Sequence, residues 1–175
     1  MGCKKRRILT MNEELIIKKA LDSGFNAAAF MDAADLLVVP DYRKYCEMNL
    51  CGCYGVNPLC PPASGTVEEM TARIRACSRV LVLQTVVENS SMENPKNGRD
   101  AKIAHNNMAD SLIDYLKSDL GIKPEDMLRM SAGPWKQSSC MSAYCVDAQN
   151  MADKVGMDCW KDDGKSRFFS EILFK

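Results

Sequence analysis

The chain has 175 residues, of which 46% are hydrophobic, and Lys+Arg and Asp+Glu each number 23. This length and composition predict one domain over residues 1–175, with a soft division at 89–99 as the alternative. The balanced charge argues against a nucleic-acid or anionic-membrane surface. No apolar run approaches the roughly 18 residues of a membrane span, and no signal peptide is visible. We therefore expect a cytoplasmic protein that binds neither nucleic acid nor membranes.

The first half of the chain contains two capping boxes, which begin at Thr10 and Thr66 and predict the starts of two helices. Between these helices, residues 36–39 have the composition of a short buried strand. After the second helix, the aliphatic run at residues 80–87 is typical of a strand buried on both faces. Residues 89–99 are rich in Asn, Ser, Pro and Gly and predict a loop.

The second half predicts a long helix over residues 100–120, a strand over 127–132 and a helix over 148–155. A short strand over 157–160 and an amphipathic helix over 168–173 complete the chain. The alternation of helices and strands predicts an α/β or α+β fold with a small mixed sheet flanked by helices.

Cysteine is concentrated in one stretch, because four of the nine cysteines lie within residues 46–62. The stretch reads CEMNLCGCYGVNPLCPP. Neither a core nor a loop needs thiols at this density, whereas a metal centre needs several soft thiolates to converge. The odd, unevenly spaced cysteines of a cytoplasmic chain do not predict disulfides. We favour an iron–sulfur centre, with zinc as the alternative, because the chain lacks the C-x-x-C knuckle of zinc ribbons.

The predicted cofactor-binding cysteines are Cys46, Cys51, Cys53, Cys60, Cys140 and Cys145. We expect the first metal ligands to be Cys46, Cys51 and Cys60, with the fourth from Cys53, Cys140 or Cys145. The C-x-C spacing of Cys51 and Cys53 does not require both thiols to be ligands, so Cys53 need not be one. If only three thiolates bind, one iron would be open to substrate, as in an enzyme. Cys77 and Cys159 are expected in the core, and Cys3 lies in the N-terminal tail.

A longer motif surrounds these cysteines and resembles that of a prokaryotic domain family of unknown function described as predicted metal-binding proteins. The motif C-x4-C-G-x-Y-G-x-N-x-x-C-P-P is formed here by Cys46, Cys51, Gly52, Tyr54, Gly55, Asn57, Cys60, Pro61 and Pro62. The order of elements around it is also similar, and the resemblance implies that its three cysteines are metal ligands.

The resemblance weakens after the A-G-P turn at residues 132–134. Family members continue from this proline with a ferredoxin-like run of cysteines, whereas this chain has Trp135 there and retains only Cys140 and Cys145. Either the protein has lost one cluster or its ligands have moved.

The chain offers little other chemistry. His105 is its only histidine and is expected to face solvent, and no phosphate-binding loop occurs. We therefore expect a 4Fe–4S protein that acts in electron transfer, or as an accessory to a larger redox system, with a redox protein as its partner. One alternative is a zinc-binding interaction module. The other is a thiol-based redox enzyme or sensor that uses Cys140 and Cys145.

Overall fold

The centre of the fold is a pair of long antiparallel strands. The structure is a computed structural model that describes residues 11–92 and 94–175. Strand β2 (Arg79–Glu88) pairs with β4 (Lys165–Phe174) over its whole length, from Arg79 opposite Phe174 to Glu88 opposite Lys165. The strand prediction for residues 80–87 is confirmed.

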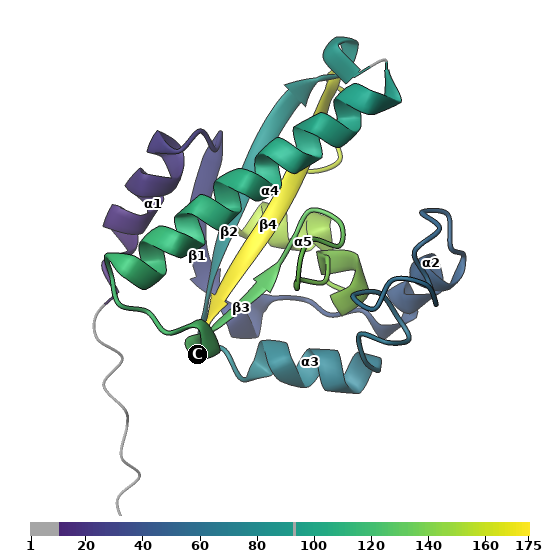
Figure 1. The fold of residues 1–175 in the computed structure, drawn as a ribbon, viewed down its shortest axis with the longest axis horizontal. Helices are drawn as coiled ribbons and strands as arrows, with labels where there is room; N and C mark the ends of the chain where they lie inside the picture. The colour runs from purple at the N-terminus through teal and green to yellow at the C-terminus, as the bar shows by residue number, and fades with distance from the viewer. Residues whose placement is uncertain (1–10, 93) are drawn as a thin grey trace, which may run out of the picture.

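Two shorter strands complete the sheet at its edges. Strand β1 (Ala27–Asp32) pairs with β2, and β3 (Met127–Met130) pairs with β4, which gives the order β1-β2-β4-β3 (Figure 1). All three pairings are antiparallel. The α+β class is therefore confirmed, with an antiparallel sheet in place of a mixed one.

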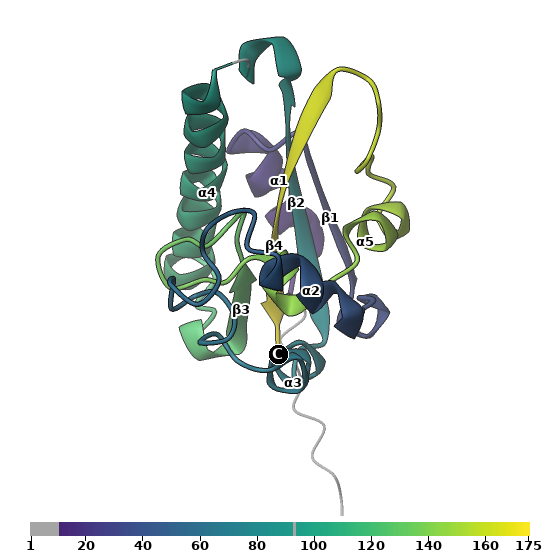
Figure 2. The same ribbon diagram turned by 90° about the vertical axis from the view of Figure 1, so that its right-hand side faces the viewer.

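One face of the sheet is covered by the helices α1 (Glu13–Asp22) and α4 (Pro95–Ser118). Leu81, Leu83 and Ile172 point to this face and pack against residues of both helices. Figure 2 shows α4 and α5 (Ala148–Lys154) on opposite sides of β2 and β4. Both faces of the sheet are therefore covered, and the second face has an apolar layer of its own.

The other face is covered by α3 (Val67–Arg75), by α5 and by a short 3-10 helix named η5 (Met141–Tyr144). Val80, Val82 and Leu173 pack there. The helix α2 (Arg43–Glu47) contacts η5 and begins the cysteine loop. Further 3-10 helices are η1 (Ala33–Asp35), η2 (Pro40–Tyr42), η3 (Asn89–Met92) and η4 (Pro124–Asp126). Among the helices of the described residues, none combines the length and apolar character that crossing a membrane requires.

The predicted starts of three helices can be compared with the observed N-caps. The capping box at Thr66 is confirmed: its Oγ1 accepts from Glu69 N at 3.2 Å, and Thr66 N donates to Glu69 Oε2 at 2.9 Å. Thr10 lies outside the described residues, and Asn12 is the N-cap of α1. Helix α4 begins earlier than expected, because Asn94 caps Lys96 N at 2.9 Å and Pro95 occupies the first turn.

Three predicted elements near the sheet are wrong. Residues 168–173 belong to β4 and not to a helix. The prediction failed because the spacing of their apolar side chains fits a helix and a fully buried strand equally well. Residues 36–39 contribute only one isolated bridge, between Val38 and Val146. Residues 157–160 form no strand, because the chain there crosses from α5 towards β4 without a strand partner.

Candidate metal centre

The cysteine loop, residues 46–62, folds as a series of tight turns held by its own backbone. Cys60 N donates to Asn57 O at 2.9 Å, and Asn57 N donates to Cys53 O at 3.0 Å. Gly52 and Gly55 have φ of +72° and +71°, which a side chain would disfavour. The two glycines therefore permit the tight backbone of these turns.

Polar side chains of the loop also stabilise its own backbone. Asn57 Oδ1 accepts from Leu59 N at 2.9 Å, and Asn49 Oδ1 accepts from Tyr54 N at 2.9 Å. These amides hold the thiols on a shaped scaffold.

The C-terminal cysteines flank η5, which the sheet positions. Cys140 forms a bridge with Ser131, the residue that follows β3. Cys145 ends η5 with φ 57° and ψ 28°, a left-handed conformation that non-glycine residues seldom adopt, and it is buried. Val39 N donates to Cys145 O at 2.8 Å, which ties this segment to the chain just before α2.

The two cysteine-bearing segments touch each other. Cys46 Sγ lies 3.8 Å from Ser142 O, in the middle of the Cys140–Cys145 segment. Arg43 reinforces this contact, because its guanidinium donates to Gly65 O at 3.0 Å and to Ala143 O at 3.1 Å. Arg43 was missed by the sequence analysis, since a single arginine three residues before a cysteine is no signal by itself.

The electrostatic environment of the thiols also reflects their proximity. Burial raises the pKa of Cys60 to about 12, and neighbouring thiols contribute, with Cys140 first among them. Burial likewise raises the pKa of Cys46, and Cys140 is again the leading thiol neighbour. The thiols that contribute to one or both of these shifts are Cys46, Cys51, Cys53, Cys140 and Cys145. These shifts keep the thiols protonated, and a bound metal cation would be needed to favour their thiolate forms.

Exposure differs among the predicted ligands. Cys51 is exposed, Cys60 and Cys145 are buried, and the other three are partly buried. Within residues 11–92 and 94–175, no three side chains of His, Cys, Asp or Glu lie close enough together to hold a metal ion. The ligand assignment therefore depends on thiol chemistry and on the proximity of the two segments.

The remaining cysteines lie elsewhere. Cys77 is buried in the core, as predicted, and its Sγ is 3.5 Å from Arg73 O. Cys159 is partly buried against the same core, although the strand expected around it is absent. Cys3 lies outside the described residues.

The prediction for His105 is wrong, because this side chain is fully buried between α4 and the sheet. Its Nδ1 is 2.8 Å from Thr85 Oγ1, and its Nε2 is 2.8 Å from Ser170 Oγ. Burial, with a smaller effect of Arg129, lowers its pKa to about 4. Both ring nitrogens have partners on the sheet face opposite η5. His105 is therefore not a candidate metal ligand beside the cysteine loop, where the candidate ligands are thiols.

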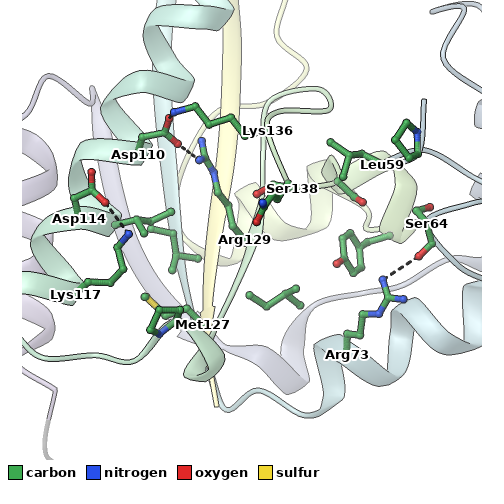
Figure 3. Close-up of a pocket in the computed structure, with 18 of the residues that line it drawn as sticks. Leu59, Ser64, Arg73, Asp110, Asp114, Lys117, Met127, Arg129, Lys136 and Ser138 are labelled. Atoms are coloured by element: carbon green, nitrogen blue, oxygen red, sulfur yellow. Dashed lines mark hydrogen bonds and ion pairs between the residues drawn. The ribbon is translucent and has the colours of Figure 1, made fainter. Parts of the chain in front are cut away.

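A cavity of about 780 Å³ opens between the cysteine loop and α4. Figure 3 shows Asp110, Arg129 and Lys136 on one side and Ser64 with Arg73 on the other. Arg129 and Lys136 both pair with Asp110, and Arg73 donates to Ser64 O at 2.9 Å. The charges of this cavity are therefore largely compensated within its own wall.

Fold and site together define a small α+β protein in which two cysteine-rich segments meet on one side of an antiparallel sheet. Residues 29–134 match the family described as predicted metal-binding protein (DUF2284). The match covers more than half of the chain, so this protein belongs to that family, and the resemblance stated from the sequence is confirmed. The matched range includes the four loop cysteines and ends before Cys140. Neither the curated proteins nor the solved structures yielded a match.

Proposed function

We propose that this protein binds one 4Fe–4S cluster and passes electrons to a redox protein partner. Cys46, Cys51 and Cys60 would supply three ligands, and Cys140 the fourth. The observation that carries the proposal is the contact of Cys46 Sγ with Ser142 O, which joins the two thiol-bearing segments at one place. A bound cluster would supply one-electron chemistry at this junction.

The donor set supports iron–sulfur chemistry. Four thiolates are the common ligand set of such clusters, and six thiols lie in the two segments. The single histidine is engaged with Thr85 and Ser170 on the other face of the sheet. Mixed histidine–thiolate coordination therefore has no support here.

Cys140 is the best-supported fourth ligand. It is the leading thiol neighbour of both Cys46 and Cys60. Cys53 Sγ instead lies 3.6 Å from Cys51 O and faces the loop's own backbone. Cys145 is buried beneath η5, where its carbonyl is bound by Val39 N.

The surface around the loop supports transfer to a protein partner. Cys51 is exposed, and Leu50 and Val56 of the same loop are 86% and 79% exposed. Exposed aliphatic side chains beside a redox centre form a short-range apolar contact surface. This arrangement favours electron exchange across a docked interface.

Thiol exchange has less support, because the thiolate is the reactive form of cysteine. Burial raises the pKa of Cys140, and backbone hydrogen bonds offset only part of this effect. A protonated thiol is a poor nucleophile at neutral pH.

The ligand assignment is tested by single serine substitutions followed by iron analysis of anaerobically purified protein. We expect Cys46→Ser, Cys51→Ser, Cys60→Ser and Cys140→Ser each to lose most of the iron. Cys77→Ser is the matched control, because this buried cysteine lies outside the two thiol-bearing segments. Full iron retention in Cys60→Ser, or equal loss in Cys77→Ser, would contradict the assignment.

A further inference from the structure

A second cavity, of about 960 Å³, lies on another side of the C-terminal cysteine segment. Its walls come from residues 140–142 and 145–149, from Trp160 and Lys161, from the first half of β4, and from Lys102 beside Gly133. A volume of this size accommodates a cofactor or a substrate. The proposed cluster does not account for the cationic and aromatic side chains that line it.

The lining of this cavity carries excess positive charge. Its cations are Lys102, Lys161, Lys165 and Arg167, and its one acid is Asp147. The Asp147 carboxylate is already engaged, because it accepts from Tyr42 OH at 3.0 Å and from Asn150 N at 2.8 Å as the N-cap of α5. An anion in the cavity would therefore meet cations without a competing free carboxylate.

The acids that pair with three of these cations lie outside the lining. Lys161 pairs with Asp158 at 3.0 Å, Lys165 with Glu88 at 3.5 Å, and Arg167 with Asp163 at 2.5 Å. These pairs orient the cations at the rim. The pairs of Lys161 and Lys165 are exposed, and exposed pairs are weak and yield to a better anion. The Arg167 side chain is only 6% exposed, so its pair with Asp163 holds it in place.

Lys102 differs from the other lysines of α4. Lys96 pairs with Asp100 at 3.0 Å and Lys117 with Asp114 at 2.7 Å, whereas Lys102 forms no ion pair within the described part of the chain. Its Nζ would lie only 3.3 Å from a Cβ at position 133, so the missing side chain of Gly133 leaves room for it. The A-G-P turn thereby seats an unpaired ammonium group at the cavity.

Aromatic side chains reach the same cavity. Trp160 is 81% exposed, and its backbone N is held by Gln149 Oε1 at 3.2 Å. Tyr42 and Tyr45 also line the cavity, with ring centroids 5.5 Å apart. A large indole that packs against little protein offers a flat face for a planar ligand.

We infer that this cavity binds an aromatic ring that carries a phosphate or carboxylate group, a chemistry shared by mononucleotides. Lys102 receives the anionic group, and Trp160 stacks on the ring. The 780 Å³ cavity is less suited to this ligand, because Asp110 and Asp114 lie in its own lining beside the cations. The inference goes beyond the proposed function and holds for any metal in the cysteine site.

In the test, the protein is purified with its metal and is then titrated with FMN, riboflavin and AMP. Binding is followed by flavin fluorescence and, for AMP, by equilibrium dialysis. Riboflavin keeps the ring system but lacks the phosphate. We expect saturable FMN binding that is about tenfold tighter than riboflavin binding, the size of one charge-assisted contact. Saturable AMP binding without FMN binding would also support the site, provided that it responds to the variants described next.

The variants assign the two roles. Lys102→Met should weaken FMN or AMP binding about tenfold and leave riboflavin unchanged. Trp160→Ala should weaken every ligand that binds. Lys96→Met is the matched control, because it removes a lysine of the same helix that lies outside the lining.

Three results would overturn the inference: no FMN or AMP binding at concentrations up to about 1 mM, equal FMN and riboflavin affinities, or unchanged FMN and AMP affinities in Lys102→Met. Iron and zinc are measured in every sample. A protein without iron that still binds FMN contradicts only the proposed cluster, and an iron-loaded protein without ligand binding contradicts only this inference.

Discussion

Glu171 is a buried acid with no visible compensation. It lies on β4 opposite Val82 of β2 and Met130 of β3, and it is fully buried. Neither carboxylate oxygen has a hydrogen-bond partner within the described residues. Burial alone raises its pKa from an ordinary value of 4.5 to about 8. The side chain is therefore neutral in the folded protein at pH 7.

Replacing Glu171 with glutamine should remove a pH-dependent loss of stability. In the unfolded chain the carboxyl group ionises above pH 4.5, whereas in the folded protein it ionises only near pH 8. The unfolded state therefore binds fewer protons between these values, and the free energy of unfolding falls as pH rises. The stability is fully present below pH 4.5 and is lost as pH approaches 8.

The expected magnitude follows from the two pKa values. At about 1.36 kcal/mol per pH unit, the interval from 4.5 to about 8 corresponds to about 5 kcal/mol. Glu171→Gln keeps the shape of the side chain and cannot ionise. Its stability relative to the wild type should therefore increase by up to about 5 kcal/mol between pH 4 and pH 8.

Urea denaturation at several pH values, on samples of equal metal content, measures this difference. Glu125→Gln is the control, because Glu125 is exposed on η4 and its removal should leave the pH dependence nearly unchanged. If wild type and Glu171→Gln gave parallel stability curves from pH 4 to pH 8, the carboxyl group would not be held neutral by burial.

Three further perturbations address the frame around the site. Arg43→Met removes the bonds to Gly65 O and Ala143 O and should cost about 2–3 kcal/mol in urea denaturation and reduce iron retention; unchanged stability would contradict the role of this arginine. Thr66→Ala breaks the capping box and should cost about 1 kcal/mol, whereas Thr66→Ser should cost less. The imidazole of His105 should stay neutral by NMR until pH approaches 4, so its contribution to stability is lost as pH falls from 6.5 towards 4; titration near 6.5 would disprove its burial.

Local signals predicted much of the fold. The Thr66 capping box and the aliphatic run of β2 are written in consecutive residues, and both occur as expected. Strand β4 was missed because the apolar spacing of its residues satisfies both helical and buried-strand patterns, and only pairing with β2 decides between them. The solvent-facing position expected for His105 is wrong, because this side chain lies on the buried face of α4.

In the candidate site, too, one part is signalled by consecutive residues and the other depends on the fold. The thiol density of residues 46–62 is a local signal and identified the loop directly. Its meeting with the Cys140–Cys145 segment depends on the sheet, which brings together residues about 100 apart in sequence, as the contact between Cys46 and Ser142 illustrates. No sequence spacing encodes that contact or the bridging role of Arg43.

The proposed cluster is tested by quantifying iron, acid-labile sulfide and zinc per chain in wild-type protein purified without oxygen. We expect about four irons and four sulfides per chain, the content of one 4Fe–4S cluster, with a visible absorption band that bleaches on reduction. A colourless protein that holds one zinc and no iron would contradict it.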